Sequence, residues 1–336
     1  MGRLSQCLGV AAVSTLATIL AGVAVAQSGY AEKDGHPPKT PDGQPDLSGY
    51  WTNDSFTPLE RPEALGDKEF YTREEAAKFL QSRLDRLNSQ PANAVHYDDA
   101  IWQAENYDKV ANLRTSIVFD PANGRLPPLT AAAQRRLPAQ RAAQRGKVPS
   151  LSAKDRSLGE RCISWGNVGP PMVPPTYNAN LQILQAPSVV VIRYEMMHDT
   201  RVVHLDGREH PPAALQWMAG HSIGHWEGDT LVVDTTNFTD DTNFRGSPAS
   251  TRQDIFGTSH MHVVERFKRT DADTIDYSFT VDDPETWTAP WSGAEQIRRS
   301  DAQIYEFACH EGNYGLRNIL SAQRAAEKRN PRQRTE

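Results

Sequence analysis

Short apolar runs follow one another closely through the second half of the chain. Turn-forming residues such as Asp-Gly and Glu-Gly-Asp separate them, and the gaps are too short for crossover helices between parallel strands. This pattern predicts an antiparallel meander, and about eight strands are enough to close a barrel. The runs are LQILQAP, VVVIRYEM, RVVHL, IGHWEG, TLVVDTTNF, HMHVVERFKR, TIDYSFTVDD and QIYEFACH.

Two helices are expected outside this β-rich region. Thr72 stands three residues before Glu75, which is the spacing of a capping box, and apolar residues at helical spacing follow it. We therefore predict a helix over 72–88, and a second one that begins near Tyr314. The fold class is mainly β, a meander closing into a barrel, with an N-terminal helical extension and a C-terminal helix.

The region between the first helix and the meander is less regular. Residues 114–128 alternate in polarity around a Pro-Ala-Asn-Gly turn, which predicts a hairpin. The connector 157–177 is rich in Gly and Pro, so it cannot be regular and is expected to lie on the surface of the barrel.

The chain opens with an arginine followed by an apolar stretch that ends in Ala-Val-Ala, the pattern of a secretory signal with a small-residue cleavage site. A retained membrane anchor is the alternative, although the stretch is barely long enough to span a bilayer. The expected regions are a signal peptide (1–26), a flexible leader (27–48), an N-terminal extension (49–178), the barrel core with its C-terminal helix (179–325) and a charged tail (326–336).

The charge balance gives no sign of a polyanionic partner. The net charge is −6, and loss of residues 1–26 removes Arg3 and no acid, which leaves −7. This favours neither nucleic acid nor, after signal cleavage, an anionic membrane surface. The oligomeric state does not follow from the sequence.

Two cysteines remain after signal cleavage, Cys162 and Cys309. Thiols pair in the oxidising compartments that exported proteins reach, so we predict a Cys162–Cys309 disulfide in a periplasmic or secreted protein. The functional alternative is a reactive Cys309 beside His310.

The preferred catalytic candidates lie in the turn between two apolar strands. Glu195 and Arg201 are placed to meet across this hairpin, where the guanidinium would keep the carboxylate ionised. His198, next to Asp199, could then act as an acid or base near neutral pH. The structural alternative is a hairpin end stapled by an ion pair.

A metal site is the second candidate, because eight of the ten histidines lie between 198 and 310. His260 and His262 would share one face of a strand, as the first ligands of a zinc or iron site often do. No convincing third ligand follows. His221 and His225 also share a face, and both point outward if Trp226 faces the interior.

A third polar cluster precedes the C-terminal helix. His310, Asn313 and Tyr314 could contact a ligand near the free N–H groups of the helix, or could simply cap it beside the disulfide. The chain contains no G-x-S-x-G, Walker, H-E-x-x-H, C-x-x-C or dinucleotide motif. We therefore expect chemistry without an organic cofactor, with a divalent metal as the alternative.

Several segments resemble a large family of exported bacterial proteins, mostly named only as hypothetical. They are RYEMMHDTRVVHLDGREHPP, GHSIGHWEGDTLVVDTTNF, HMHVVERFKRTDADTIDYSFTVDDPETWTAPW and IYEFACHEGNYGLRNIL, and the resemblance covers roughly residues 46–325. It implies a secreted, mainly β protein without assigning catalytic residues. The polar signatures of the family fall on His198, Arg201, Asp206-Gly207-Arg208, His210, Trp226, Glu227 and Cys309, whereas His204 departs from the pattern.

A shorter resemblance concerns the fold. Gly49-Tyr50-Trp51 looks like the G-x-W opening of lipocalin-like barrels, in which the tryptophan closes the bottom of the barrel. Such barrels hold small apolar molecules, and some relatives are hydratases, cyclases or isomerases. The resemblance implies a cavity for an apolar or aromatic molecule, with Trp51, Trp226, His310, Asn313 and Tyr314 as binding candidates.

Three hypotheses of function follow. The first is an acid–base enzyme of the hydratase, isomerase, lyase or hydrolase type that uses His198, Asp199, Glu195 and Arg201. The second is a carrier of the same fold that binds its ligand without changing it. The third is a metal-dependent enzyme that uses His260 and His262.

Overall fold

The computed structural model describes residues 37–89, 112–144, 150–164, 169–174, 179–240, 243–244, 255–301 and 303–329. The expected signal peptide, together with parts of the expected leader and tail, lies outside them. In the part of the chain that the structure describes, no helix is both long and apolar enough to cross a membrane.

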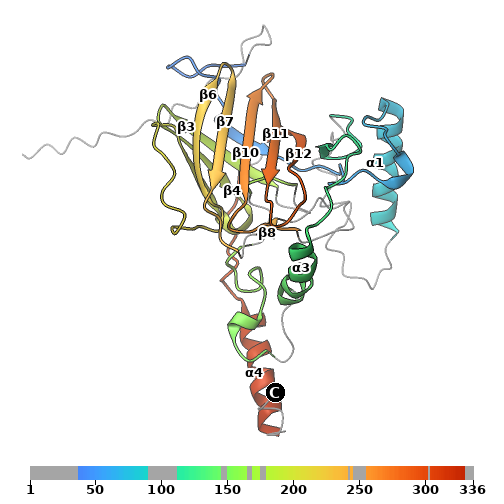
Figure 1. Cartoon of the computed structure of the whole chain (residues 1–336), viewed down its shortest axis with the longest axis vertical. Coiled ribbons are helices and arrows are strands. Elements are labelled where there is room, and N and C mark those ends of the chain that lie inside the picture. Colours follow the sequence, from blue (N-terminus) through green and yellow to red (C-terminus); the bar gives the residue numbers. More distant parts are fainter. Residues whose placement is uncertain are drawn as a thin grey trace, which may run out of the picture.

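Nine strands form a closed β-barrel, and the pairing of β12 with β1 completes the ring (Figure 1). The mainly β fold and the closure into a barrel are thus confirmed. Neighbouring strands are antiparallel except β5 and β6, which are parallel because the loop 205–220 carries the chain back along the barrel. The strands are β1 (Gly49–Thr52), β3 (Asn180–Ala186), β4 (Val189–Tyr194), β5 (Thr200–His204), β6 (His221–Glu227), β7 (Thr230–Thr236), β10 (His262–Arg269), β11 (Thr274–Asp282) and β12 (Trp291–Arg299).

In the described part of the chain, three short strands lie outside the ring. β2 (Val118–Asp120) pairs with the first half of β12, while the second half of β12 pairs with β1. β8 (Asn243–Phe244) and β9 (Ile255–Phe256) pair with each other in a separate small sheet.

The prediction of a strand at QIYEFACH is wrong. The last barrel strand is β12, and the chain has already left the barrel where QIYEFACH begins. The inward side of β12 carries Gly293 and Glu295 between Trp291 and Ile297, so it does not form a continuous apolar run. Gly293 is required there, because a Cβ atom would lie 2.5 Å from Cζ of Phe279.

Two expectations for the N-terminal extension also need correction. β1 belongs to the barrel, so the barrel reaches back beyond residue 179. The hairpin over 114–128 does not form, although Gly124 N–H closes a turn on the carbonyl of Pro121. The second arm contains two prolines without N–H groups, and it lies instead against Thr286 and Thr288.

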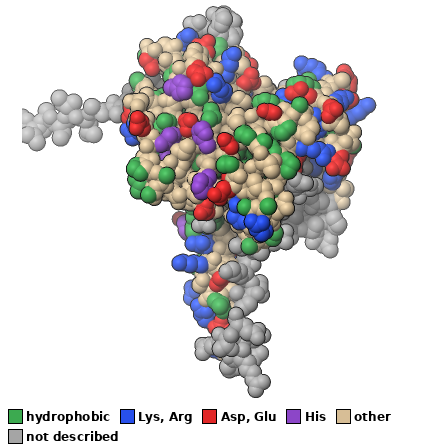
Figure 2. Space-filling view, viewed as in Figure 1, with side chains coloured by type: hydrophobic (Ala, Val, Ile, Leu, Met, Phe, Trp, Pro, Cys, Tyr) green, Lys and Arg blue, Asp and Glu red, His purple; other side chains and the backbone are tan. Residues whose placement is uncertain are grey.

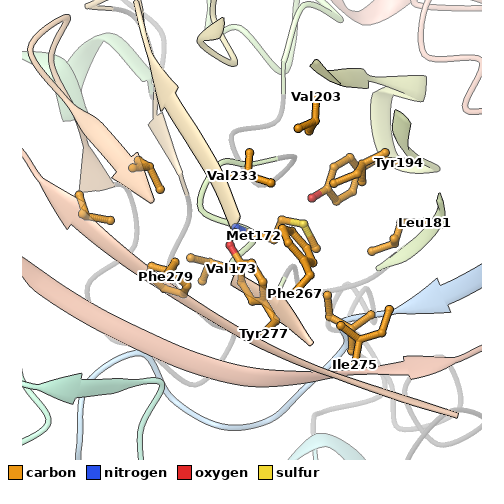
Figure 3. Close-up of a cluster of buried hydrophobic side chains, with 14 of the residues drawn as sticks. Met172, Val173, Leu181, Tyr194, Val203, Val233, Phe267, Ile275, Tyr277 and Phe279 are labelled. Atoms are coloured by element: carbon orange, nitrogen blue, oxygen red, sulfur yellow. Dashed lines mark hydrogen bonds between the residues drawn. The ribbon is translucent and has the colours of Figure 1, made fainter. Parts of the chain in front are cut away.

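The barrel interior is filled by side chains from all around the ring and from the connector. β10 and β11 point Val263, Phe267, Tyr277 and Phe279 inward. Met172 is fully buried among them (Figure 3). The connector is therefore not confined to the surface as expected, because its apolar residues have no other place to leave water.

One end of the barrel is closed by Trp51. Its indole Nε1 donates a hydrogen bond to the carbonyl of Leu47 over 2.9 Å, and the ring is fully buried. The guanidinium groups of Arg269 and Arg299 each lie 5.2 Å from the ring centre. These cation–π contacts hold the ring beside the ends of β10 and β12, where Arg269 and Arg299 lie.

Both predicted helices form. α1 (Arg73–Asn88) has Thr72 as its N-cap and a complete capping box with Glu75, so the predicted helix is confirmed. α4 (Tyr314–Arg329) begins at the predicted residue and extends away from the barrel (Figure 1). The other helical segments among the described residues are α3 (Ala131–Gln144) and the 3-10 turns Glu63–Leu65, Ala153–Asp155 and Met196–His198.

The disulfide between Cys162 and Cys309 is confirmed, with the two Cα atoms 5.7 Å apart. It links the connector to the segment that precedes α4. Asn313 strengthens this link, because its side-chain amide donates to the carbonyl of Glu160 over 3.1 Å. The base of α4 is thereby tied to the connector.

Candidate active site

Four imidazoles and one carboxylate meet on the outer face of the barrel. His204 ends β5, His221 begins β6, His262 begins β10, and Asp234 lies near the end of β7 between the last two. His210 comes from the loop that follows β5. Figure 2 shows histidine side chains gathered on the face formed by β6, β7 and β10.

Strand alternation explains why these side chains point outward. In β6, Ser222 and Trp226 face the interior, so His221 and His225 face away from it, as the sequence indicated for this orientation. In β7, Leu231 and Val233 are buried inside, which leaves Asp234 on the outer face.

Asp234 bridges two histidines through its two oxygens. Its Oδ1 lies 3.1 Å from Nε2 of His210, and its Oδ2 lies 3.0 Å from Nε2 of His262. The Nδ1 atom of His210 in turn lies 2.9 Å from Nδ1 of His221. The four residues therefore form one hydrogen-bonded chain.

The hydrogen-bond network assigns the tautomers of this chain. An ionised carboxylate only accepts, so His210 and His262 each present N–H at Nε2. Neutral His210 then has its lone pair on Nδ1, and His221 donates to it from its own Nδ1. The lone pair of His221 is consequently on Nε2, the nitrogen that no described side chain engages.

The environment shifts the pKa values of His221 and His262, the two ends of the hydrogen-bonded chain, in opposite directions. Burial lowers the pKa of His221, and the charges of His210, His204 and Arg208 lower it further. The hydrogen bond to Asp234 raises the pKa of His262 against the effect of burial. Near neutral pH, His221 is thus the base and His262 is the more readily protonated group.

The carboxylate between them stays ionised. Burial alone would raise the pKa of Asp234, but its hydrogen bonds and charge interactions with His262 and His210 outweigh that effect and lower it. An anion at this position holds both imidazoles in place by hydrogen bonds and favours positive charge on His262.

Two rings stand beside His221. The His204 ring stacks on it at a centroid distance of 5.6 Å, and the Trp217 ring is tilted against it at 5.7 Å. Trp217 is 42% exposed although it is a large apolar side chain. The base therefore lies beside an accessible aromatic surface.

The predicted pairing of Glu195 with Arg201 is wrong. Arg201 points into the barrel, where Nη1 and Nη2 donate to the two oxygens of Glu265 over 2.7 and 3.2 Å. Glu195 is also buried, but it accepts a hydrogen bond from the backbone N–H of Tyr305. Arg201 occupies an inward-facing position in β5, whereas Glu195 lies just after the end of β4, so the two side chains do not meet.

His198 and Asp199 lie at the tip of that hairpin. Nδ1 of His198 is 3.2 Å from the carbonyl oxygen of Phe307, and its ring is exposed. Burial raises the pKa of Asp199 even though Thr200 N–H donates to it and His198 lies nearby. The four predicted catalytic residues thus do not form one group, because Arg201 is engaged inside the barrel.

The other predicted residues are also dispersed. His260 lies in the turn before β10, with Nδ1 3.3 Å from Glu285, so it does not share a strand face with His262. Among the described residues, no three His, Cys, Asp or Glu side chains are placed to hold a metal ion together. His310 and Tyr314 are exposed beside the disulfide, and Asn313 Oδ1 accepts from the N–H of Leu316 in the first turn of α4.

A hollow of about 370 Å³ lies where the N-terminal extension crosses β7, β10, β11 and β12. None of the histidines lines it. The ionisable residues Arg114, Arg266, Lys268, Asp276 and Glu295 line it together with Phe70.

Reasoning from the sequence missed the pairing of Asp234 with the histidines. The turn at Glu227-Gly228-Asp229 sets the β6–β7 register, which places Asp234 opposite Ile223 on the outer face beside His221. The position of Asp234 could therefore have been predicted from the sequence. The position of His210 could not, because it depends on the path of a loop.

No protein-family model matches this chain, and neither the curated proteins nor the solved structures contain a match to it. The resemblance to the exported family with the W-E-G-D-T-L-V-V segment therefore stays a prediction.

Proposed function

We propose that this protein is an exported acid–base enzyme in which His221 is the general base and His262 the general acid. The observation that carries the proposal is the 2.9 Å contact between His210 and His221, in series with the 3.1 Å contact between His210 and Asp234. A carboxylate that orients an imidazole, which orients a second imidazole, is an arrangement suited to proton transfer.

The proposed step begins at Nε2 of His221. This nitrogen removes a proton from water or from the substrate, and the positive charge that develops is stabilised through His210 by Asp234. His262, held by the same carboxylate, supplies a proton to the leaving or developing oxygen. Opposite pKa shifts on two neighbouring groups are the usual basis for dividing the acid and base roles.

The substrate that these surroundings favour is a small aromatic or apolar molecule. Trp217 and His204 offer flat surfaces beside the base, and Trp217 is open to solvent. The proposed reactions are hydrolysis, hydration, elimination or isomerisation, since each requires the removal and return of a proton. They need no organic cofactor.

The proposed location is the periplasm or the exterior of the cell. Support comes from the Cys162–Cys309 disulfide, because such a bond fits an oxidising compartment. The predicted signal peptide points the same way.

Hydrolysis of 4-nitrophenyl acetate tests the proposal, because this aryl ester reports an accessible neutral imidazole base. We expect His221→Ala to lower kcat/KM by about 100-fold or more. His225→Ala is the matched control, since His225 lies on the same outer face of the same strand and pairs only with Glu227 among the described residues. It should leave turnover unchanged.

Two outcomes would overturn the proposal. One is equal turnover in His221→Ala and His225→Ala. The other is loss of turnover after dialysis against a chelator with recovery on adding zinc, which would make the histidines metal ligands rather than a proton relay.

A further inference from the structure

The barrel interior contains polar groups that the proposed acid–base site does not use. Arg201, Glu265, Tyr277, Glu295 and Asn53 are all at most 4% exposed. Tyr277 donates from its hydroxyl to Glu265 over 2.8 Å. An apolar core alone would not require such a group of residues, because each costs free energy to bury.

Met172 contacts three members of this group, and Figure 3 shows it beside Tyr277 in the barrel interior. Its N–H donates to the hydroxyl oxygen of Tyr277 over 2.8 Å, and its carbonyl accepts from Asn53 Nδ2 over 3.3 Å. Its sulfur lies 4.0 Å from Nη2 of Arg201. The barrel thus engages the amide groups of an intruding segment through side chains, without any strand pairing.

The segment leaves several interior atoms without hydrogen-bond partners. They are the hydroxyl of Tyr194, Oε2 of Glu295, Oδ1 of Asn53 and Nε of Arg201. Figure 3 shows the Tyr194 hydroxyl directed toward Met172. Unpaired polar atoms at this depth each cost free energy, so the segment fills the space without matching its hydrogen-bonding groups.

We propose that the barrel interior is a second ligand site, which residues 169–174 fill in the free protein. A small molecule takes the place of Met172 and accepts hydrogen bonds from the donor groups that the segment leaves unpaired, which are Tyr194, Glu295 and Nε of Arg201. This site is separate from the histidine chain, which lies on the outer face of the barrel.

The chemistry of the interior identifies the class of ligand. Tyr194 and Arg201 Nε offer N–H or O–H donors, and burial raises the pKa of Glu295 well above its usual value, so this carboxyl group donates as well. Arg201 and Glu265 neutralise each other, so a charged ligand would be buried without a counter-ion. The ligand is therefore an uncharged apolar molecule with one or more carbonyl oxygens, such as a ketone, ester or lactone.

Amide hydrogen exchange gives the first test. If the segment leaves the interior without unfolding of the barrel, the N–H of Met172 exchanges at least about 100-fold faster than the backbone N–H of Tyr277 in β11. Equal rates would show that the segment is a permanent part of the core and would overturn the proposal.

Binding of the neutral fluorescent ketone 6-propionyl-2-(dimethylamino)naphthalene gives the second test. The native protein should bind it, and Tyr194→Phe should weaken binding by about fivefold, the effect of one lost hydrogen bond. The fold should survive, because the Tyr194 hydroxyl has no partner in the free protein. Tyr305→Phe, at a tyrosine that is 74% exposed, is the control and should bind normally.

Absence of binding, or equal binding by Tyr194→Phe and Tyr305→Phe, would overturn the proposal. His221→Ala should bind the ketone as the native protein does. The interior site and the outer acid–base site can thus fail independently.

Discussion

Arg201 and Glu265 are 64 residues apart in the sequence, yet they form a two-point ion pair inside the barrel, with N–O distances of 2.7 and 3.2 Å. Both side chains are almost completely buried, and Tyr277 adds a third hydrogen bond to the carboxylate. This pair links β5 to β10 across the interior. The ion pair of Arg201 therefore lies in the barrel interior and not at the tip of the β4–β5 hairpin.

Removal of one partner of this pair should be costly. We expect Arg201→Met to lower the free energy of unfolding by about 3–5 kcal/mol, because Glu265 is left buried without a counter-charge. Arg208→Met is the control, since Arg208 pairs with Asp206 at the surface, and its urea midpoint should be that of the native protein. Replacing both Arg201 and Glu265 by apolar residues should recover part of the loss.

Glu295 should make the stability of the protein depend on pH. Burial raises its pKa well above the usual value, outweighing the hydrogen bond from Asn53, so the folded state holds a proton that the unfolded state releases. Stability therefore falls as pH rises from about 4.5 toward the folded pKa, by up to about 1.4 kcal/mol per pH unit for one proton. Urea unfolding of Glu295→Gln should lose this contribution to the slope; an unchanged slope would contradict the assignment.

The histidine chain makes a prediction that needs no substrate. NMR titration should give a pKa for His221 below that of an ordinary histidine and a pKa for His262 above it. Asp234→Asn should lower the pKa of His262, because it removes the carboxylate that favours the protonated ring. Titration of both histidines at the ordinary value would contradict the network.

Turnover should have a bell-shaped pH profile for the same reason. The base form of His221 is lost as pH falls through its lowered pKa, and the acid form of His262 is lost as pH rises through its raised pKa. The rate of aryl ester hydrolysis against pH measures both limbs. Asp234→Asn should move the alkaline limb to lower pH, whereas His225→Ala should move neither limb.

The disulfide should stabilise the protein by restricting the unfolded chain. Cys162 and Cys309 are 147 residues apart, so Cys162→Ser with Cys309→Ser should lower the free energy of unfolding by about 3–5 kcal/mol. Urea unfolding of this double variant, compared with the native protein, measures the difference. The reduced native protein should match the variant, and a result in which only one of them is destabilised would contradict the entropic explanation.

Local features were predictable because their causes lie within a few residues. The capping box at Thr72 predicted the start of α1, and short apolar runs between turn-forming residues predicted seven barrel strands. Alternation along a strand placed His221 and His225 on the same face. The sequence analysis missed β12 because the causes of its pattern are not local. Gly293 is needed for contact with Phe279, and Glu295 is buried in the barrel interior.

The sequence by itself determined the mainly β class, the helices α1 and α4, and the pairing of Cys162 with Cys309. Periodicity and capping residues act locally, and these two cysteines are the ones that remain after the predicted signal peptide is removed. Only the tertiary structure decided which residues meet. Closing the barrel turned Arg201 toward Glu265, drew Met172 inside and brought Asp234 to His210 and His262, 24 and 28 residues away. Alternation sets the direction of a side chain, but its partner depends on strand order, register and the path of the loops.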